Sequence, residues 1–174
     1  MSDDVKGQLV ALLPRLRRFA YGLTGSVDEG DDLVQAACVR ALSSLDQWQP
    51  GTRLDSWMFR IIQNLRIDGF RARRTRGEQV DPDVLADLAG EDGRRTTEAA
   101  LTLDRVRRIV GELPEDQRTV LMLVAVDGLS YQEAAAVLDV PIGTVTSRLA
   151  RARQRIGARL EAPAPASVAG NPVR

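Results

Sequence analysis

Arginine is concentrated in two segments of the chain, at densities that suit contact with nucleic acid. Residues 53–76 carry seven arginines against two aspartates, a local net charge of +5. Residues 144–159 carry five arginines and no acidic residue, again +5. Guanidinium groups bind phosphate in bidentate geometry and displace counterions from DNA. Both segments are therefore candidate nucleic-acid contacts, although a single charged run is also typical of a solvated helix face.

The neutral total of 24 basic and 24 acidic residues hides these segments, because an acidic stretch lies between them. Residues 77–96 hold six acidic residues and two arginines, a net charge of −4. The stretch also contains Pro82, Gly90 and Gly93 and few apolar residues, which is typical of a linker. At low salt it could compete with DNA for the arginines, or it could simply be solvated.

Several kinds of chemistry are excluded by composition. The chain has no histidine and one cysteine, Cys38, so it has no imidazole base, no histidine metal ligand and no internal disulfide. It also has no glycine-rich phosphate loop and no carboxylate cluster within an apolar stretch. We therefore predict a protein that is not an enzyme and that needs no cofactor or metal. Cys38 is expected to pack in the core.

The chain also lacks the features of a membrane or exported protein. Its apolar runs are much shorter than the roughly 20 residues that span a bilayer, and the first residues, MSDDVKGQ, do not form a signal peptide. We expect a cytoplasmic protein without membrane insertion.

Helical periodicity runs through most of the sequence and predicts an all-α fold of two small domains. In the first domain, residues 1–76, helices are expected from Ser26 to about Leu45 and over about 54–74. Residues 77–97 would be a flexible acidic linker and 162–174 a disordered tail. The second domain, 98–161, contains Pro114 at a helix start, Gly128 at a helix end, and a capping box of Ser130 and Glu133.

The end of the second domain predicts a helix-turn-helix. A short alanine-rich helix, Ser130–Leu138, is followed by a break at Asp139-Val140-Pro141 and by a helix to about Arg159. The last helix has an apolar stripe, made of Val145, Leu149, Ala152 and Ile156. The opposite face is polar and basic: Ser147, Ala150, Arg151 and Gln154, flanked by Thr146, Arg148 and Arg155. Such a helix suits the major groove, and the alternative is a basic surface helix of a bundle.

The helix over 54–74 combines arginines with aromatic residues. Its predicted apolar face holds Leu54, Trp57, Met58, Ile61, Leu65 and Ala72. Its other face holds Phe59, Arg60, Gln63, Arg66, Phe70, Arg71 and Arg74. Cations beside rings suit single-stranded DNA, where arginine neutralises phosphate and a ring stacks on an unpaired base. Alternatively, the two phenylalanines pack on neighbouring helices, which we expect more for Phe59.

The helix from Ser26 to Leu45 has apolar residues on both faces. The predicted core face consists of Val34, Cys38, Ala41 and Leu45. The opposite face consists of Asp32, Ala36, Val39 and Ser43, with Gln35 beside them. Apolar residues on an otherwise exposed face indicate a protein partner.

Taken together, the motifs resemble those of extracytoplasmic-function sigma factors. The resemblance of the second domain lies in Leu113–Arg118, Asp127–Ala135 and Gly143–Arg153. In the first domain, Trp57–Asp68 is similar to the family's −10 recognition and melting segment, and Asp32–Gln35 to its polymerase-binding helix.

The resemblance implies three sets of functional residues. The −35 element of the promoter would be contacted by Thr144, Thr146, Ser147, Arg148, Arg151 and Arg155. The −10 element would be contacted by Asn64, Asp68, Arg71 and Arg60, with the loop from Trp48 to Arg53 forming the pocket for a flipped-out base. Core polymerase would be contacted by Asp32, Gln35 and Val39.

The function implied is that of a promoter-specificity subunit of bacterial RNA polymerase, which recognises the −35 duplex and melts the −10 element. Its partners would be the β′ clamp helices and β flap of the core enzyme, promoter DNA and an anti-sigma factor. That factor could hold the otherwise nucleoid-associated chain at the membrane. The alternative is a stand-alone helix-turn-helix repressor or activator, whose first domain dimerises or senses a signal.

Overall fold

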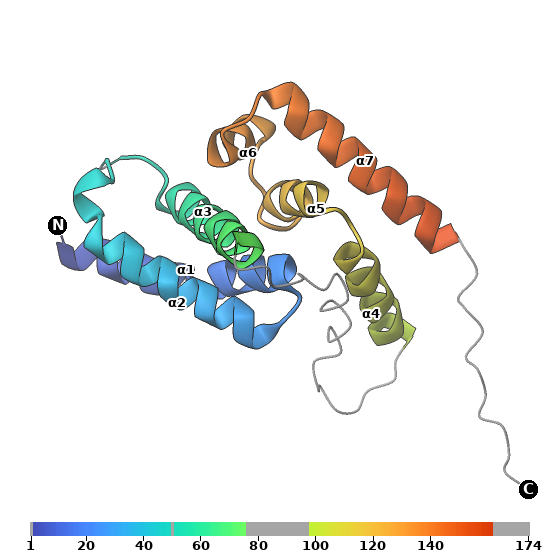
Figure 1. The fold of residues 1–174 in the computed structure, drawn as a ribbon, viewed down its shortest axis with the longest axis horizontal. Coiled ribbons are helices and arrows are strands. Elements are labelled where there is room, and N and C mark those ends of the chain that lie inside the picture. Colours follow the sequence, from blue (N-terminus) through green and yellow to red (C-terminus); the bar gives the residue numbers. More distant parts are fainter. Residues whose placement is uncertain (1, 50, 76–97, 162–174) are drawn as a thin grey trace, which may run out of the picture.

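The computed structural model describes residues 2–49, 51–75 and 98–161, and over these ranges the regular structure is helical, as predicted (Figure 1). The predicted linker, 77–97, and the predicted tail, 162–174, lie outside the described residues.

The N-terminal unit is built from α1 (Ser2–Thr24), α2 (Val27–Ser43) and α3 (Leu54–Thr75), which pack on one another. Leu16 and Phe19 of α1 and Met58, Phe59 and Ile62 of α3 are fully buried. The rings of Phe19 and Phe59 meet edge-on with centroids 4.8 Å apart, a favoured aromatic geometry. This core fixes the rotation of α3 and therefore the direction in which its polar face points.

The α2 helix begins as predicted but ends earlier. The Ser26 side chain accepts a hydrogen bond from the Glu29 backbone N–H, which caps the helix. The helix ends at Ser43, and Leu45–Gln47 forms a separate 3₁₀ turn, η1. On the predicted core face, Val34 and Ala41 are buried and Cys38 is half-buried, because Ala37 rather than Cys38 faces α1 and α3 most directly.

The C-terminal unit consists of α4 (Glu98–Gly111), α5 (Glu115–Leu121), the π-helical segment η3 (Met122–Val126), α6 (Tyr131–Leu138) and α7 (Ile142–Glu161). The predicted helix-turn-helix is confirmed in α6 and α7. Asp139, in the left-handed region at φ 54°, makes the turn between them, a conformation that aspartate tolerates better than most residues. Val145, Leu149 and Ala152 of α7 are buried, as the predicted stripe requires.

The capping box at the start of α6 is complete. Ser130 accepts a hydrogen bond from the Glu133 backbone N–H at 3.2 Å, and Glu133 accepts one from the Ser130 N–H at 2.7 Å. We expect Ser130→Ala to lower the free energy of unfolding by about 1 kcal/mol, the usual cost of losing a cap. Urea denaturation followed by circular dichroism measures this. Ser43→Ala, which loses only a bond to the Arg40 carbonyl, is the control, and an equal effect of the two changes would contradict the prediction.

The two units are not separate bodies, because their buried side chains form one continuous apolar cluster. Helix α3 contacts α6, and α1 contacts α4, α5 and η3 (Figure 1). At the contact of α1 with η3, the Met122 side chain lies directly against Gly22: a β-carbon at Gly22 would stand 2.3 Å from the Met122 terminal methyl. Glycine at this position therefore lets the two units approach closely.

Candidate nucleic-acid interface

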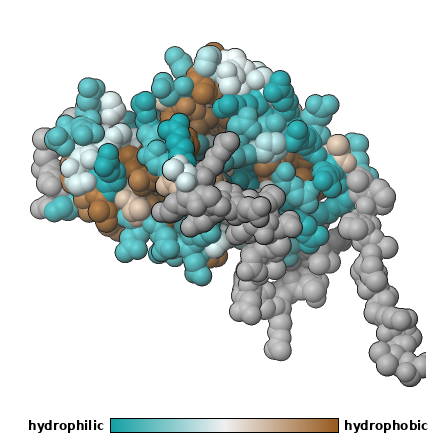
Figure 2. Space-filling view, in the orientation of Figure 1, coloured by the Kyte–Doolittle hydropathy of each residue, from teal (hydrophilic) through white to brown (hydrophobic). Residues whose placement is uncertain are grey.

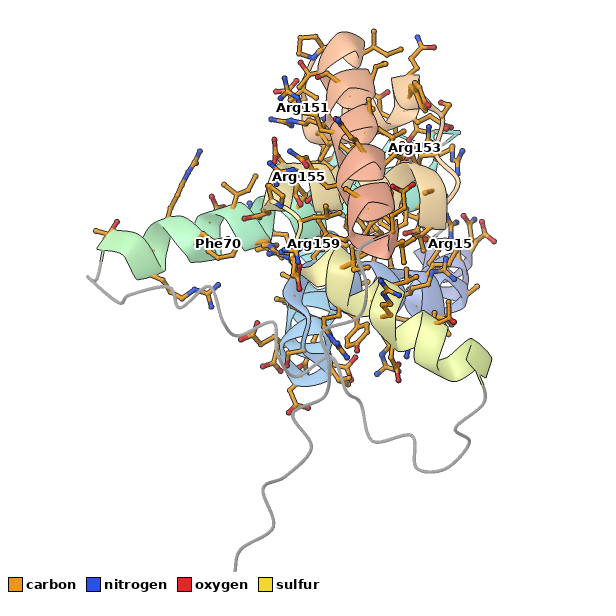
Figure 3. The ribbon with its side chains drawn as sticks, turned by 90° about the vertical axis from the view of Figure 1, so that its right-hand side faces the viewer. Arg15, Phe70, Arg151, Arg153, Arg155 and Arg159 are labelled. Carbon is orange, nitrogen blue, oxygen red and sulfur yellow. The ribbon has the colours of Figure 1, made fainter. Side chains whose placement is uncertain are left out.

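The polar face of α7 is exposed, as predicted. Ser147, Arg151 and Gln154 are all solvent-accessible, and Figure 3 shows Arg151 and Arg155 projecting from one side of the helix and Arg153 from the other. Within the described ranges, Arg151, Arg153 and Arg155 have no acidic partner, whereas Arg159 pairs with Glu112 at 3.0 Å. Helix α7 thus presents free guanidinium groups on two sides, with Arg151 and Arg155 together on one of them.

The predicted hydroxyl contacts of α7 lie at its exposed N-terminal end. Thr146 and Ser147 donate hydrogen bonds to the carbonyls of Ile142 and Thr144, at 3.0 and 3.1 Å. These bonds hold the hydroxyl oxygens in fixed positions with lone pairs left to accept from a partner. Thr144 is half-buried.

The predicted −10 residues of α3 share one exposed face. Arg60, Asn64, Asp68 and Arg71 are all exposed, at spacings of three and four residues that bring side chains to one side of a helix. Asp68 and Arg71 approach to 3.9 Å. Part of this face is turned toward the C-terminal unit rather than toward open solvent.

A groove of about 610 Å³ separates this face from α5, α6 and α7. Arg60, Asn64 and Arg71 line its α3 side, while Asp116 and Arg148 line the opposite side. Arg148 is tied to Asp116 at 3.1 Å, and only 28% of its side chain is exposed. The structure therefore brings predicted −10 and −35 residues to one groove.

Two side chains predicted on the exposed face of α3 are buried instead. Gln63 is 9% exposed and Arg66 is 7% exposed. The reason is the C-terminal unit, which covers this side of α3 and supplies Glu115 as a partner for Arg66, at 3.1 Å. Burial lowers the pKa of Arg66, an effect that Glu115 opposes.

The two phenylalanines of α3 differ in burial, and one residue of its predicted apolar face is exposed. Phe59 is fully buried, as we expected more for it than for Phe70. Phe70 is half-buried, with the guanidinium groups of Arg66 and Arg73 at 5.1 and 5.0 Å from its ring centroid. Ala72 was predicted on the apolar face and is exposed, because the last turns of α3 extend past the bundle.

The predicted pocket loop is held by acidic residues. Arg53 donates hydrogen bonds to both carboxylate oxygens of Asp55 and also to Glu133 of α6. Burial favours the neutral form of Asp55, but hydrogen bonds from Arg53, Arg15 and the Ser56 N–H outweigh it and lower the pKa of Asp55 to about 2. Trp48 is half-buried, and its buried indole N–H has no hydrogen-bond partner among the described residues.

A buried aspartate between the two units was missed by the sequence analysis. The Asp127 side chain is completely buried and lies 2.8 Å from Arg18 and 3.7 Å from Arg15. Arg15 also donates to the Asp127 backbone carbonyl, and its own position at the junction is visible in Figure 3. Burial raises the pKa of Asp127, and the two arginines oppose this shift. The only hint in the sequence was the spacing of three residues between Arg15 and Arg18. Asp127 itself gave no hint, because an aspartate before a glycine such as Gly128 is typical of a turn.

The predicted polymerase surface on α2 is exposed. Asp32 and Gln35 are accessible, and Val39 is 64% exposed with Leu42 beside it at 47%. Figure 2 shows hydrophobic patches on the surface at the left-hand end of the molecule, where α1 and α2 lie. Burial raises the pKa of Cys38, which agrees with a packing role for this thiol and disfavours its reactive thiolate form.

Within the described ranges, no three histidine, cysteine, aspartate or glutamate residues are grouped so that they could hold a metal ion. None of the described helices is both long enough and apolar enough to span a membrane.

Comparison with known proteins gives consistent matches along the chain. Sigma-70 region 2 matches residues 9–76, and sigma-70 region 4 matches residues 103–156. The chain is 38% identical over 160 residues to the ECF RNA polymerase sigma factor EcfG of Rhodopseudomonas palustris, covering 92% of this chain and 87% of the relative. It is 35% identical over 161 residues to the sigma factor CnrH of Cupriavidus metallidurans, covering 88% and 82%.

Solved structures resemble the fold over most of its length. The sigma factor RpoE in complex with the anti-sigma factor NepR, from Bartonella quintana, has a TM-score of 0.72 at 32% identity, over 91% of this chain and 97% of the other. The structure of CnrH in complex with the cytosolic domain of CnrY gives 0.63 at 33% identity, over 89% and 86%.

Proposed function

The chain belongs to the extracytoplasmic-function branch of the sigma-70 family of RNA polymerase sigma factors, and from this premise we propose how its two helical units divide the work of promoter recognition. As a sigma factor it is a DNA-binding subunit of transcription initiation. Residues 98–161 bind the −35 duplex, and residues 1–76 bind core polymerase and the −10 element, with residues 77–97 as the linker. The protein acts in the cytoplasm and is not itself an enzyme.

The observation that carries the −35 assignment is the exposed face of α7, on which Arg151 and Arg155 have no acidic partner among the residues that the structure describes. Arg151 and Arg155 lie one turn apart on one side of the helix, away from the stripe that is buried in the core. Phosphate contacts from such residues give affinity, and bidentate bonds to guanine or hydroxyl contacts from Thr146 and Ser147 give sequence preference.

The −10 assignment depends on Asn64 and the arginines around it. An asparagine amide offers a donor and an acceptor to a base edge, and Asn64 lies between Arg60 and Asp68 on one exposed face. Capturing a flipped base costs a few kcal/mol of stacking. Hydrogen bonds from Asn64 and phosphate contacts from Arg60 and Arg71 would offset that cost, with polymerase binding supplying the remainder.

Core polymerase is expected to bind the exposed face of α2 through its β′ clamp helices and the C-terminal unit through its β flap. We expect Val39→Asp to weaken association with core polymerase by at least about tenfold, because a charge would be buried against the partner. Since Val39 is 64% exposed, the melting temperature should not change.

The matched control for Val39 is Val27→Asp, at a 57% exposed valine in the first turn of the same helix. Fluorescence anisotropy with labelled protein and core enzyme measures both variants. If Val39→Asp and the unaltered protein had equal affinity for core polymerase, the exposed face of α2 would not be part of the interface.

Regulation by an anti-sigma factor is supported by the two similar sigma factors whose structures were solved with NepR and CnrY. Run-off transcription with core polymerase on a pool of random promoters tests the function as a whole. A sigma factor directs specific transcripts only with core enzyme, whereas a stand-alone regulator would bind a specific duplex tightly without it.

A further inference from the structure

We propose that the buried side chains of Gln63, Arg66 and Arg118 form a binding site for a small monovalent inorganic anion, for which chloride is the probe. The site lies where α3 meets the start of α5, at the ion pair of Arg66 with Glu115. It concerns an ion held by the folded chain, so the inference does not depend on the proposed function.

The first argument is a surplus of buried positive charge. Arg66 is 7% exposed and Arg118 is 5% exposed. Within the described residues, the one acidic residue that forms an ion pair with either of them is Glu115, whose carboxylate lies 3.1 Å from the Arg66 Nε. Glu115 also lies three residues before Arg118, on the same side of α5. Two guanidinium groups therefore share one carboxylate, and arginine cannot relieve the surplus by losing its proton at neutral pH.

The neighbouring charges do not remove this surplus. Arg73 is half-buried, and its charge further lowers the pKa of Arg66. Burial, and after it the charge of Arg66, lowers the pKa of Arg118 to about 10. Glu29 of α2 attracts Arg66, but it is exposed, where water and salt screen its charge. Because an uncompensated buried charge is costly, this cluster would gain stability from a further negative charge.

The second argument is a set of buried donors without acceptors. Among the described residues, neither Nε nor Nη1 of Arg66 has a hydrogen-bond partner, and the same holds for Nε of Arg118. The Arg118 Nη1 donates to the Gly111 carbonyl at 2.9 Å. Gln63, one turn before Arg66, is 9% exposed and has a buried side-chain oxygen in the same condition. Rotating this amide by 180° places its N–H groups there instead. An anion would accept from several of these donors at once.

The third argument is a contrast with the other polar cluster between the two units. That cluster joins three arginines to three acidic residues: Arg15, Arg18 and Arg53 to Asp55, Asp127 and Glu133. Its charges balance within the chain, so it needs no ion. Of the two clusters, the one around Arg66 is the one with surplus positive charge, which makes it the place where an anion would be retained.

The site has an approach from solvent and a preference for one kind of ion. Gln63 and Glu115 both line the groove between α3 and the C-terminal unit, so an ion could enter from there. One negative charge balances two guanidinium groups and a carboxylate, which favours a monovalent ion over sulfate or phosphate. A halide accepts hydrogen bonds from every direction, so donors on α3 and α5 can share it.

The test measures thermal unfolding of the full chain by circular dichroism, in sodium chloride and in sodium gluconate at the same ionic strength. Gluconate is too large for a site between packed side chains. At a chloride concentration about tenfold above its dissociation constant, we expect the melting temperature to be about 3–5 °C higher in chloride. Equal melting temperatures in the two salts at every concentration overturn the proposal.

Two variants add the same charge at different places. Gln63→Glu has nearly the same shape as the original side chain and supplies a fixed carboxylate to the site. It should melt higher than the unaltered chain in gluconate and lose the difference between the two salts. Gln132→Glu, at an exposed position of α6, is the matched control and should keep that difference.

The variants also give results that contradict the proposal. If Gln63→Glu keeps the chloride effect, chloride acts elsewhere on the chain. If Gln63→Glu melts below Gln132→Glu in gluconate, or does not fold, the site has no surplus positive charge to receive an acid. The ³⁵Cl nuclear magnetic resonance line provides a second measurement. The unaltered chain and Gln132→Glu should broaden this line more than Gln63→Glu does, and equal broadening by all three overturns the proposal.

Discussion

Asn64→Ala is expected to reduce open-complex formation by about tenfold or more while changing the initial binding to duplex promoter less than about twofold. The difference arises because the Asn64 amide can reach a base edge only after the −10 bases have unstacked. A paired amide contact to a base is worth about 1–3 kcal/mol, and about 1.4 kcal/mol corresponds to tenfold. Permanganate footprinting measures opening, and gel shift of the polymerase complex at low temperature measures initial binding.

The control for Asn64 is Gln8→Ala, which removes an exposed amide on α1 that donates a hydrogen bond to Asp4. It should leave both measurements unchanged. Asn64→Asp adds information, because it keeps an acceptor and removes the donor. Equal losses of Asn64→Ala in both assays would show that the residue contributes to general DNA affinity rather than to base capture.

Arg151→Ala/Arg155→Ala is expected to weaken binding of the holoenzyme to the −35 duplex by about 10- to 100-fold at moderate salt. If both side chains contact phosphates, the slope of log affinity against log salt should fall by about 2, since each phosphate contact releases about one counterion. If Arg151 also contacts a guanine, discrimination at one base pair should fall as well. Anisotropy titrations at several salt concentrations give both quantities.

The matched control removes two arginines that do not lie on the proposed DNA side. Arg153 projects from the other side of α7 (Figure 3), and Arg107 pairs with Asp104 on α4. Arg153→Ala/Arg107→Ala should lose much less affinity and keep the salt slope. Similar losses in both double variants would mean that diffuse charge, rather than a defined face of α7, binds the promoter.

The parts of the fold that depend on short-range patterns were predicted correctly. The buried stripe of α7 and the capping box of Ser130 and Glu133 both lie within one or two helical turns, so the sequence contains all the residues that determine them. The end of α2 was predicted two residues too late, which is ordinary for helix ends. The roles of the DNA and polymerase residues stay predictions.

The features that were missed all involve residues far apart in the chain. Arg66 resembles an exposed helix arginine until α5 brings Glu115 to it. Asp127 resembles a turn residue until Arg15 and Arg18, more than a hundred positions earlier, enclose it. A single sequence gives no distance information of this kind. The contact between the two units, and with it the groove that joins Asn64 to Arg148, therefore required the structure.

The continuous apolar core has a consequence for the fate of the free protein. Met122 and its neighbours are covered by α1 while the two units are packed together. The free protein in this arrangement therefore buries apolar surface of the kind that proteases and chaperones recognise. The same apolar surface would be exposed if the two units separated while neither DNA nor polymerase was bound. Such a molecule would be degraded sooner than one whose units stay together.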